Sequence, residues 1–357
     1  MDNFVYEGLS TRVIFGVETL KGLPAEVSRL GSKALVLCTP YQREKADKAA
    51  RILGELAVGI YDQAVMHVPV ESARAARAEA KRLGADVYVA VGGGSTTGLG
   101  KAIALEFGYP IVAVPTTYAG SEMTPIWGLT EGGIKRTGRD MKVLPRTVIY
   151  DPTLTVSLPP MLSATSGMNA IAHSVEALYA QNRNPIISMM AEESIRALAH
   201  SLPTLMKDPK DLETRSEALY GAWLAGISLG SVGMALHHKL CHTLGGSFNL
   251  PHSEVHTVII PHATAYNRAA APEAMKRIAR ALGHADAADG LFELEITLGT
   301  PMKLSEIGMR YEDLDRAADL ASQNPYYNPR PVTRDGIRAL LENAFSGSRP
   351  GVALSMP

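Results

Sequence analysis

The chain has 357 residues, of which 46% are hydrophobic, and its formal net charge at pH 7 is −1. This length exceeds one typical core, so we expect two domains, and the near-neutral charge argues against nucleic acid or an anionic membrane as a partner. The two cysteines, Cys38 and Cys241, are few enough for a reducing compartment. Without a secretory signal or an apolar run of about 18 residues, the protein is expected to be cytoplasmic.

The first 150 or so residues alternate short apolar runs with helical patterns. Strands are predicted at residues 34–38, 57–61, 86–91, 111–114 and 147–150, and helices at 45–56, 70–83 and 97–106. This alternation is typical of a doubly wound α/β domain with a parallel sheet. Residues 4–15 are predicted to form an edge hairpin.

After residue 151 the pattern becomes helical. Helices are predicted at residues 164–180, 188–200, 212–229, 233–244, 271–282 and 334–345, with Pro159-Pro160 and Pro203 as breakers. The sequence therefore predicts an α/β dinucleotide-binding domain at 1–155 and an all-helical catalytic domain at 156–357. We expect the active site in the cleft between them.

A glycine-rich turn follows the strand at 86–91 and opens a helix. Its candidate cofactor-binding residues are Gly93, Gly94, Ser95 and Thr96. A turn of this kind directs backbone N–H groups and the positive end of a helix dipole at an anion such as a pyrophosphate. The Walker A and Rossmann spacings both fail, because Ser95 and Thr97 stand where glycines are required. The alternative is a tight turn without a ligand.

Two further strand ends add candidate cofactor contacts, because parallel strands present their carboxyl ends at one edge of a sheet. The strand at 111–114 is followed by Thr116, Thr117, Tyr118 and Ser121. After the strand at 34–38, Thr39 replaces the acidic residue that would hold a ribose 2′-hydroxyl and repel a 2′-phosphate. Both NADH and NADPH are therefore expected to bind.

Histidines are concentrated between residues 237 and 262. His238 and His242 are four residues apart, as are Asn169 and His173 upstream, so each pair shares a helix face. His252 follows a break predicted at Gly245-Gly246. Three imidazoles and an oxygen ligand would suit a transition metal, although any single histidine is more often structural. His237, His256 and His262 are assigned to that structural class.

These patterns, in chain order, resemble the iron-containing alcohol dehydrogenase superfamily. The shared stretches are Gly92-Gly93-Gly94-Ser95, Pro115-Thr116-Thr117, residues 167–173, and His238, His242 and Pro251-His252. The resemblance implies a dehydroquinate synthase-like fold, a nicotinamide cofactor and a homodimer. It also implies four metal-ligand positions, which match Asn169, His173, His238 and His252 here. Because the family's Asp is replaced by a neutral amide at Asn169, we expect no metal.

The Asn variant, with residues 235–242 and 324–331, resembles the branch of this family that reduces a small dianionic enone in the breakdown of aromatic compounds. The resemblance implies that hydride addition creates an enolate within a pocket formed by Asn169 and the four histidines. His242, the family's non-ligand active-site histidine, is expected to supply the proton, since an imidazole pKa near about 6.5 suits this work. Lys239, Arg330 and Tyr326 are the substrate-binding candidates.

Three alternatives remain open at this point. The chain could be a metal-dependent alcohol dehydrogenase with Asn169 as a weak ligand. It could be a synthase of the dehydroquinate synthase type, which uses its nicotinamide only transiently. It could also be a nucleotide-binding protein without catalytic activity.

Overall fold

The computed structural model describes residues 3–132 and 134–351, which form two compact units. The first, the sheet unit, consists of Gly8–Leu158 with Lys210–Leu219, and the second, the helical unit, is the rest of the described chain. The described chain leaves the sheet unit at Leu158, slightly beyond the predicted boundary at 155. The return of Lys210–Leu219 to the sheet unit was not predicted.

The sheet unit is built on a six-stranded parallel sheet with the order β1-β8-β5-β4-β2-β3. Its strands are β1 (Arg12–Phe15), β2 (Ala34–Leu37), β3 (Ala57–Tyr61), β4 (Val87–Gly92), β5 (Ile111–Pro115) and β8 (Thr147–Tyr150). Five lie where the sequence predicted them. The edge hairpin predicted at 4–15 is wrong: β1 instead pairs in parallel with β8, because its partner comes from the far end of the unit rather than from the adjoining segment.

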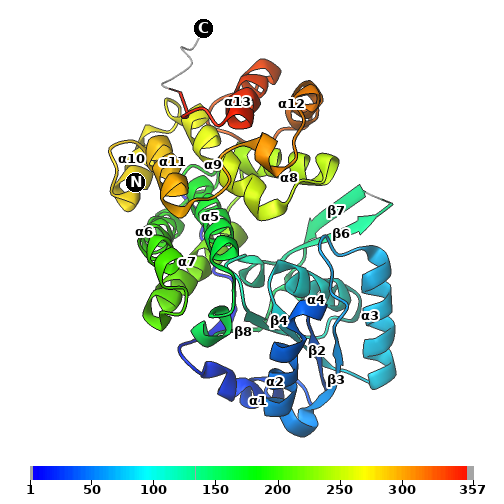
Figure 1. Cartoon of the computed structure of the whole chain (residues 1–357). Helices are drawn as coiled ribbons and strands as arrows, with labels where there is room; N and C mark the ends of the chain where they lie inside the picture. The colour runs from blue at the N-terminus through cyan, green and yellow to red at the C-terminus, as the bar shows by residue number, and fades with distance from the viewer. Residues whose placement is uncertain (1–2, 133, 352–357) are drawn as a thin grey trace. The chain divides into compact units, whose positions relative to one another are not determined.

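Helices cover both faces of this sheet (Figure 1). Apolar residues of α1 (Leu23–Ser28) and α2 (Arg43–Leu53) pack on one face, and those of α3 (Val70–Leu83) and α4 (Gly94–Phe107) on the other. Alternate residues of β4 point to the two cores, as Val89 and Ala90 show. An unpredicted hairpin, β6 (Ile126–Glu131) and β7 (Ile134–Arg139), forms a separate small sheet.

The helical unit contains α5 (Pro160–Ala177), α6 (Pro185–Lys207), α8 (Leu236–Phe248), α9 (His252–Asn267), α10 (Pro272–Leu282), α11 (Ala287–Leu298), α12 (Leu314–Ser322) and α13 (Arg334–Ser346). α7 (Leu212–Ser231) contributes residues to both units. A core shared by α8, α9, α12 and α13 includes Leu240, Ile259, Leu314 and Leu341.

Two breaks predicted in this half are misplaced. α6 runs past Pro203 to Lys207, because a proline removes one N–H without ending a helix whose apolar face is buried. α8 continues through Gly245-Gly246 to Phe248, and its C-cap residue, Asn249, adopts a left-handed conformation with φ of 54°. His252 is the first residue of the next helix.

No single helix among the described residues has the length and apolar composition needed to cross a membrane. α7 and α8 meet those criteria only when taken together, with a bend of 95° between them.

Candidate active site

The turn between β4 and α4 brings its glycines against hydroxyl groups. A Cβ at Gly92 would overlap Thr96 Oγ1 and lie 2.7 Å from Gln42 Oε1, and a Cβ at Gly93 would lie 2.8 Å from Thr117 Oγ1. Such contacts are too close for a real side chain, so both positions require glycine. At the start of α4 the turn therefore forms a concave site, here called the cradle, which consists of Gly92 and Gly93 with the side chains of Gln42, Thr96 and Thr117.

This cradle holds hydrogen-bonding groups that the protein leaves unused. Gln42 Nε2 donates to Thr116 Oγ1 at 2.9 Å, whereas Gln42 Oε1 and Thr96 Oγ1 are buried without a protein partner. Buried polar atoms are normally hydrogen-bonded, so unsatisfied ones at a helix N-terminus indicate a site for a polar ligand. Gly94 and Ser95 lie in the adjoining first turn of α4.

Two other cofactor candidates have protein partners. The buried Tyr118 hydroxyl accepts from Arg215 Nη1 at 3.0 Å, and the Ser121 carbonyl accepts from Lys101 Nζ at 2.6 Å. Thr39 lies at the start of the turn that carries Gln42, three residues before it in the chain. The structure thus brings Gly93, Thr96, Thr116 and Thr117 together, and gives Tyr118 and Ser121 structural contacts.

Lys101 is fully buried on α4. Besides Ser121, its ammonium donates to Thr124 Oγ1 at 2.9 Å and to the Ile126 carbonyl at 2.8 Å. Burial lowers the pKa of Lys101 to about 7, although the nearby Glu122 charge opposes this shift. Lys101 therefore links α4, the helix that begins at the cradle, to residues 121–126, which follow β5.

The predicted histidine cluster forms within the helical unit, where α5, α8 and α9 pack together (Figure 1). His173 Nδ1 lies 2.8 Å from His238 Nε2. His238 Nδ1 in turn lies 2.7 Å from a carboxylate oxygen of Glu176, one turn beyond His173 on α5. The ring of His242 is centred 6.0 Å from that of His238.

His242 occupies the more exposed side of this cluster, together with two of the substrate candidates. Its Nδ1 lies 3.1 Å from the Tyr326 hydroxyl, and Lys239 Nζ lies 5.9 Å from the centre of the Tyr326 ring. Partial burial raises the pKa of Tyr326, with a smaller contribution from the Glu176 charge, so its hydroxyl stays protonated. An imidazole, a phenol and a cation thus lie together.

Arg330, the third substrate candidate, is not brought to this cluster. Its guanidinium stacks 4.1 Å from the centre of the Tyr266 ring and donates to the Tyr266 carbonyl at 3.3 Å. Tyr266 lies near the opposite end of α9 from His252, roughly 20 Å along the helix.

The histidines assigned to a structural class are deeply buried. His237 Nε2 lies 2.9 Å from His256 Nδ1 and 3.5 Å from the Cys241 sulfur. Burial, reinforced by neighbouring imidazoles, holds the pKa values of His237 and His256 well below the ordinary value, so both rings are neutral. The His256 ring is centred 4.5 Å from the ring of His252. His237 and His256 therefore pack against the histidine cluster from its buried side.

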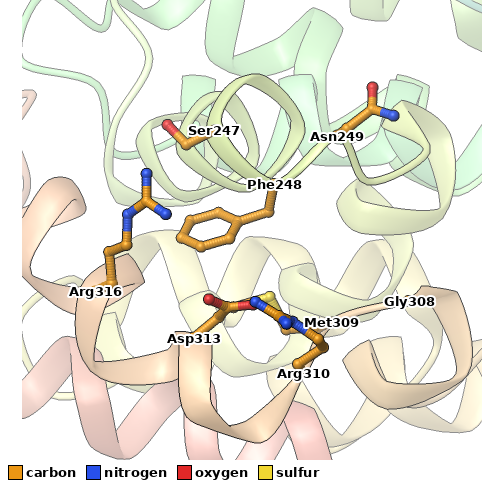
Figure 2. A pocket seen from close by; sticks show the side chains of 8 residues that line it. All are labelled: Ser247, Phe248, Asn249, Gly308, Met309, Arg310, Asp313 and Arg316. Atoms are coloured by element: carbon orange, nitrogen blue, oxygen red, sulfur yellow. The ribbon is translucent and has the colours of Figure 1, made fainter.

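A hollow of about 320 Å³ lies at the C-terminal end of α8, as Figure 2 shows. No histidine lines it. Its two cations have partners: Arg310 pairs with Asp313 at 2.7 Å, and Arg316 lies 5.5 Å from the centre of the Phe248 ring. This hollow therefore adds no group to the histidine cluster.

Comparison with known proteins places these features in a family. Residues 10–152 match the iron-containing alcohol dehydrogenase model, and residues 163–345 match the C-terminal model of the same family. The chain belongs to the iron-containing alcohol dehydrogenase family. It is therefore an oxidoreductase, and membership implies a nicotinamide cofactor.

Several similar proteins share one name. The chain is 60% identical to maleylacetate reductase of Burkholderia cepacia, over 98% of this chain and 100% of that protein. It is 56% identical to maleylacetate reductase of Sphingobium indicum, over 97% and 99% of the two chains. The crystal structure of maleylacetate reductase from Agrobacterium tumefaciens superposes with a TM-score of 0.95 at 50% identity, covering 98% and 100%.

The residues present fit a nicotinamide cofactor of this family. The cradle that a Cβ would fill at Gly92 and Gly93, and the unsatisfied Thr96 hydroxyl, which can donate, are what a pyrophosphate approaching the backbone requires. Gly93, Thr96 and Thr117 are the residues that would hold it.

The family's metal-ligand positions differ here from a site with a charged carboxylate ligand. The Asn169 oxygen is buried without a protein partner but carries no charge. The hydrogen bond between His173 and His238 occupies a lone pair that a metal would need. Among the described residues, the group that brings three ionisable donor atoms within 4.8 Å of one another is His237, Cys241 and His256, which shares no member with the family set.

Sequence reasoning missed three residues that organise these sites: Gln42, Lys101 and Glu176. A signal for Glu176 was present, since Asn169, His173 and Glu176 fall at i, i+4 and i+7 and therefore on one helix face. Gln42 and Lys101 had none, because their contacts join segments distant in sequence.

Proposed function

We propose that this protein reduces the carbon–carbon double bond of maleylacetate to give 3-oxoadipate, with NADH or NADPH as the hydride donor, in the breakdown of aromatic compounds. The observation that carries this proposal is the near-complete alignment, at 60% and 56% identity, with proteins named maleylacetate reductase. The histidine cluster supports it, because the cluster offers proton-carrying groups without a charged metal ligand at position 169.

A nicotinamide bound at the cradle would supply the hydride that adds to the alkene carbon β to the ketone. The former ketone oxygen then carries negative charge, which hydrogen-bond donors must stabilise. His242 is the proposed donor of the proton that the α carbon of this enolate takes up to restore the ketone, because it is the most exposed imidazole of the cluster and contacts the Tyr326 phenol. Lys239, beside the same phenol, is the proposed partner of a substrate carboxylate.

We propose that this reaction proceeds without a metal. An enone spreads the developing charge over several atoms, so the chemical need for a Lewis acid is smaller than for a simple alcohol. The pairing of His173 with His238, and the amide at Asn169, support the proposal. Prolonged treatment with a chelator should leave the rate unchanged; restoration of a lost rate by zinc or iron would reject a metal-free reaction.

We also propose that the enzyme uses both NADH and NADPH. Thr39 carries no negative charge, so it would not repel the 2′-phosphate of NADPH. Thr39→Asp should raise the KM for NADPH and leave the KM for NADH nearly unchanged. A wild-type enzyme that already discriminates strongly against NADPH would contradict this assignment.

The deciding experiment incubates the purified protein with maleylacetate and either reduced nicotinamide, and follows cofactor oxidation together with formation of 3-oxoadipate. Simple aldehydes serve as the comparison substrates. Faster turnover of aldehydes, dependent on added metal, would favour a metal-dependent alcohol dehydrogenase instead.

A further inference from the structure

Glu176 is a buried carboxylate surrounded by hydrogen-bond donors. One oxygen accepts from the backbone N–H of Ala235 at 2.7 Å and lies 2.7 Å from His238 Nδ1. The other accepts from the backbone N–H of His237 at 2.7 Å. Two of these three groups are backbone amides, which can only donate, so the carboxylate acts as the acceptor in each contact.

This arrangement assigns a direction to the hydrogen bonds of the cluster. With Glu176 accepting, His238 carries its hydrogen on Nδ1, and its Nε2 offers a lone pair. His173 Nδ1, which faces that lone pair at 2.8 Å, must then donate. The chain of donors runs from His173 through His238 to Glu176, and it leaves Nε2 of a neutral His173 as an acceptor.

The same carboxylate also fixes where α8 begins. Ala235 is the N-cap residue of α8 and provides no side-chain cap, so the first N–H groups of the helix need an outside acceptor. Glu176, in the last turn of α5, accepts from two of these groups and places negative charge at the positive end of the helix dipole. One side chain therefore aligns α5 with α8.

We infer that Glu176 is a positioning residue, which fixes the tautomers of His238 and His173 and so divides the cluster into an accepting and a donating side. This inference deepens the proposed function and rests on it for its catalytic consequence. His173 presents an acceptor. His242 belongs to the other side: as an imidazolium it donates from Nδ1 to the Tyr326 oxygen and carries a second hydrogen on Nε2, which it can give up to become a neutral imidazole. Of the three histidines in these contacts, His242 is then the one that donates a proton.

The test compares Glu176→Gln with a matched control, Glu295→Gln. An amide offers one acceptor oxygen to three donors, so His238 should lose its single tautomer. Glu295 is also fully buried in the helical unit, and burial raises its pKa well above the ordinary value, which favours the protonated acid that the amide mimics. Long-range ¹H–¹⁵N correlation of the full-length, nicotinamide-bound protein reports which nitrogen of His238 carries the hydrogen.

We expect His238 to be protonated on Nδ1 in the wild type and in Glu295→Gln, and to be mixed or reversed in Glu176→Gln. In that variant kcat with maleylacetate should fall by about 10²-fold or more, with the KM for the nicotinamide within about twofold of wild type. Wild-type His238 protonated on Nε2, or Glu176→Gln with an unchanged tautomer and kcat, would overturn the inference.

Two features keep the outcome decisive. If Glu176→Gln fails to fold, the wild-type tautomer alone decides, and Glu176→Asp retains the charge at shorter reach and should show an intermediate kcat. The tautomer measurement uses no substrate. If His238 shows the expected tautomer but the protein does not reduce maleylacetate, the proposed function is wrong. The inference that Glu176 fixes the tautomers of His238 and His173 would still stand.

Discussion

The hydroxyl of Tyr326 lies 3.1 Å from Nδ1 of His242, although 84 residues separate them in the chain. Because partial burial raises the pKa of Tyr326, the hydroxyl keeps its hydrogen and can donate it to the neutral imidazole that remains once His242 has given up a proton. The contact holds the ring in one tautomer and one orientation. It joins α8 to the segment between α12 and α13, which provides the Tyr326 side chain.

Tyr326→Phe should lower kcat by roughly 3- to 10-fold, the equivalent of one hydrogen bond of about 1 kcal/mol. The aromatic ring beneath Lys239 is retained, so the KM for maleylacetate should change little. The control is Tyr327→Phe, at the neighbouring exposed tyrosine. Equal kcat values for the two variants would remove the Tyr326 hydroxyl from the mechanism.

His242→Ala should lower kcat by about 10²-fold or more if His242 is the proton donor. The substitution removes an exposed ring, so the melting temperature should stay close to that of the wild type. His284→Ala, at a half-buried histidine in the turn between α10 and α11, is the matched control and should leave kcat unchanged. Near wild-type turnover in His242→Ala would assign the proton to another group.

Gly92→Ala should raise the KM for both nicotinamides by about 10-fold or more. The new methyl group would overlap Thr96 and Gln42, forcing the cradle open at the groups that would meet the cofactor. Gly100→Ala, further along α4, makes only ordinary contacts of 3.5 Å and beyond and should leave the KM unchanged. Equal KM values in the two variants would show that the nicotinamide does not approach this turn.

Local patterns predicted the parts of this fold that local interactions determine. Runs such as residues 57–61 and 147–150 are strands because β-branched and apolar residues are covered on both faces of the sheet. The partner of β1 could not be predicted, since parallel pairing with β8 joins segments more than 130 residues apart. Proline and glycine signals failed inside α6 and α8, where burial of the helix outweighs a local penalty.

In the candidate site, too, features set by one helix could be predicted, whereas features set by packing between segments could not. The i,i+4 spacing on α5 and α8 correctly indicated that Asn169, His173, His238 and His242 lie on shared helix faces, because that spacing is a property of one helix. Arg330 was chosen from a resemblance in a loop, and its stacking on Tyr266 depends on packing that no spacing encodes. The pairing of His173 with His238 likewise depends on how two helices meet.

His262 should make the protein sensitive to acid. Burial lowers its pKa to about 4, against an ordinary value of 6.5, so the folded protein keeps this imidazole neutral where the unfolded chain is already protonated. Between pH 6.5 and about 4 the unfolded state therefore binds more protons, and the free energy of unfolding falls as the pH falls. The full penalty amounts to about 3 kcal/mol.

His262→Gln removes this titration, so the free energy of unfolding of the variant should fall less than that of the wild type between pH 7 and pH 4. The difference should approach about 3 kcal/mol at the acid end and vanish above pH 6.5. Denaturant titrations of both proteins across this range measure it, with His284→Gln as the control for a half-buried histidine of the same unit. Parallel pH profiles for wild type and His262→Gln would mean that His262 ionises in the folded protein as readily as in the unfolded chain.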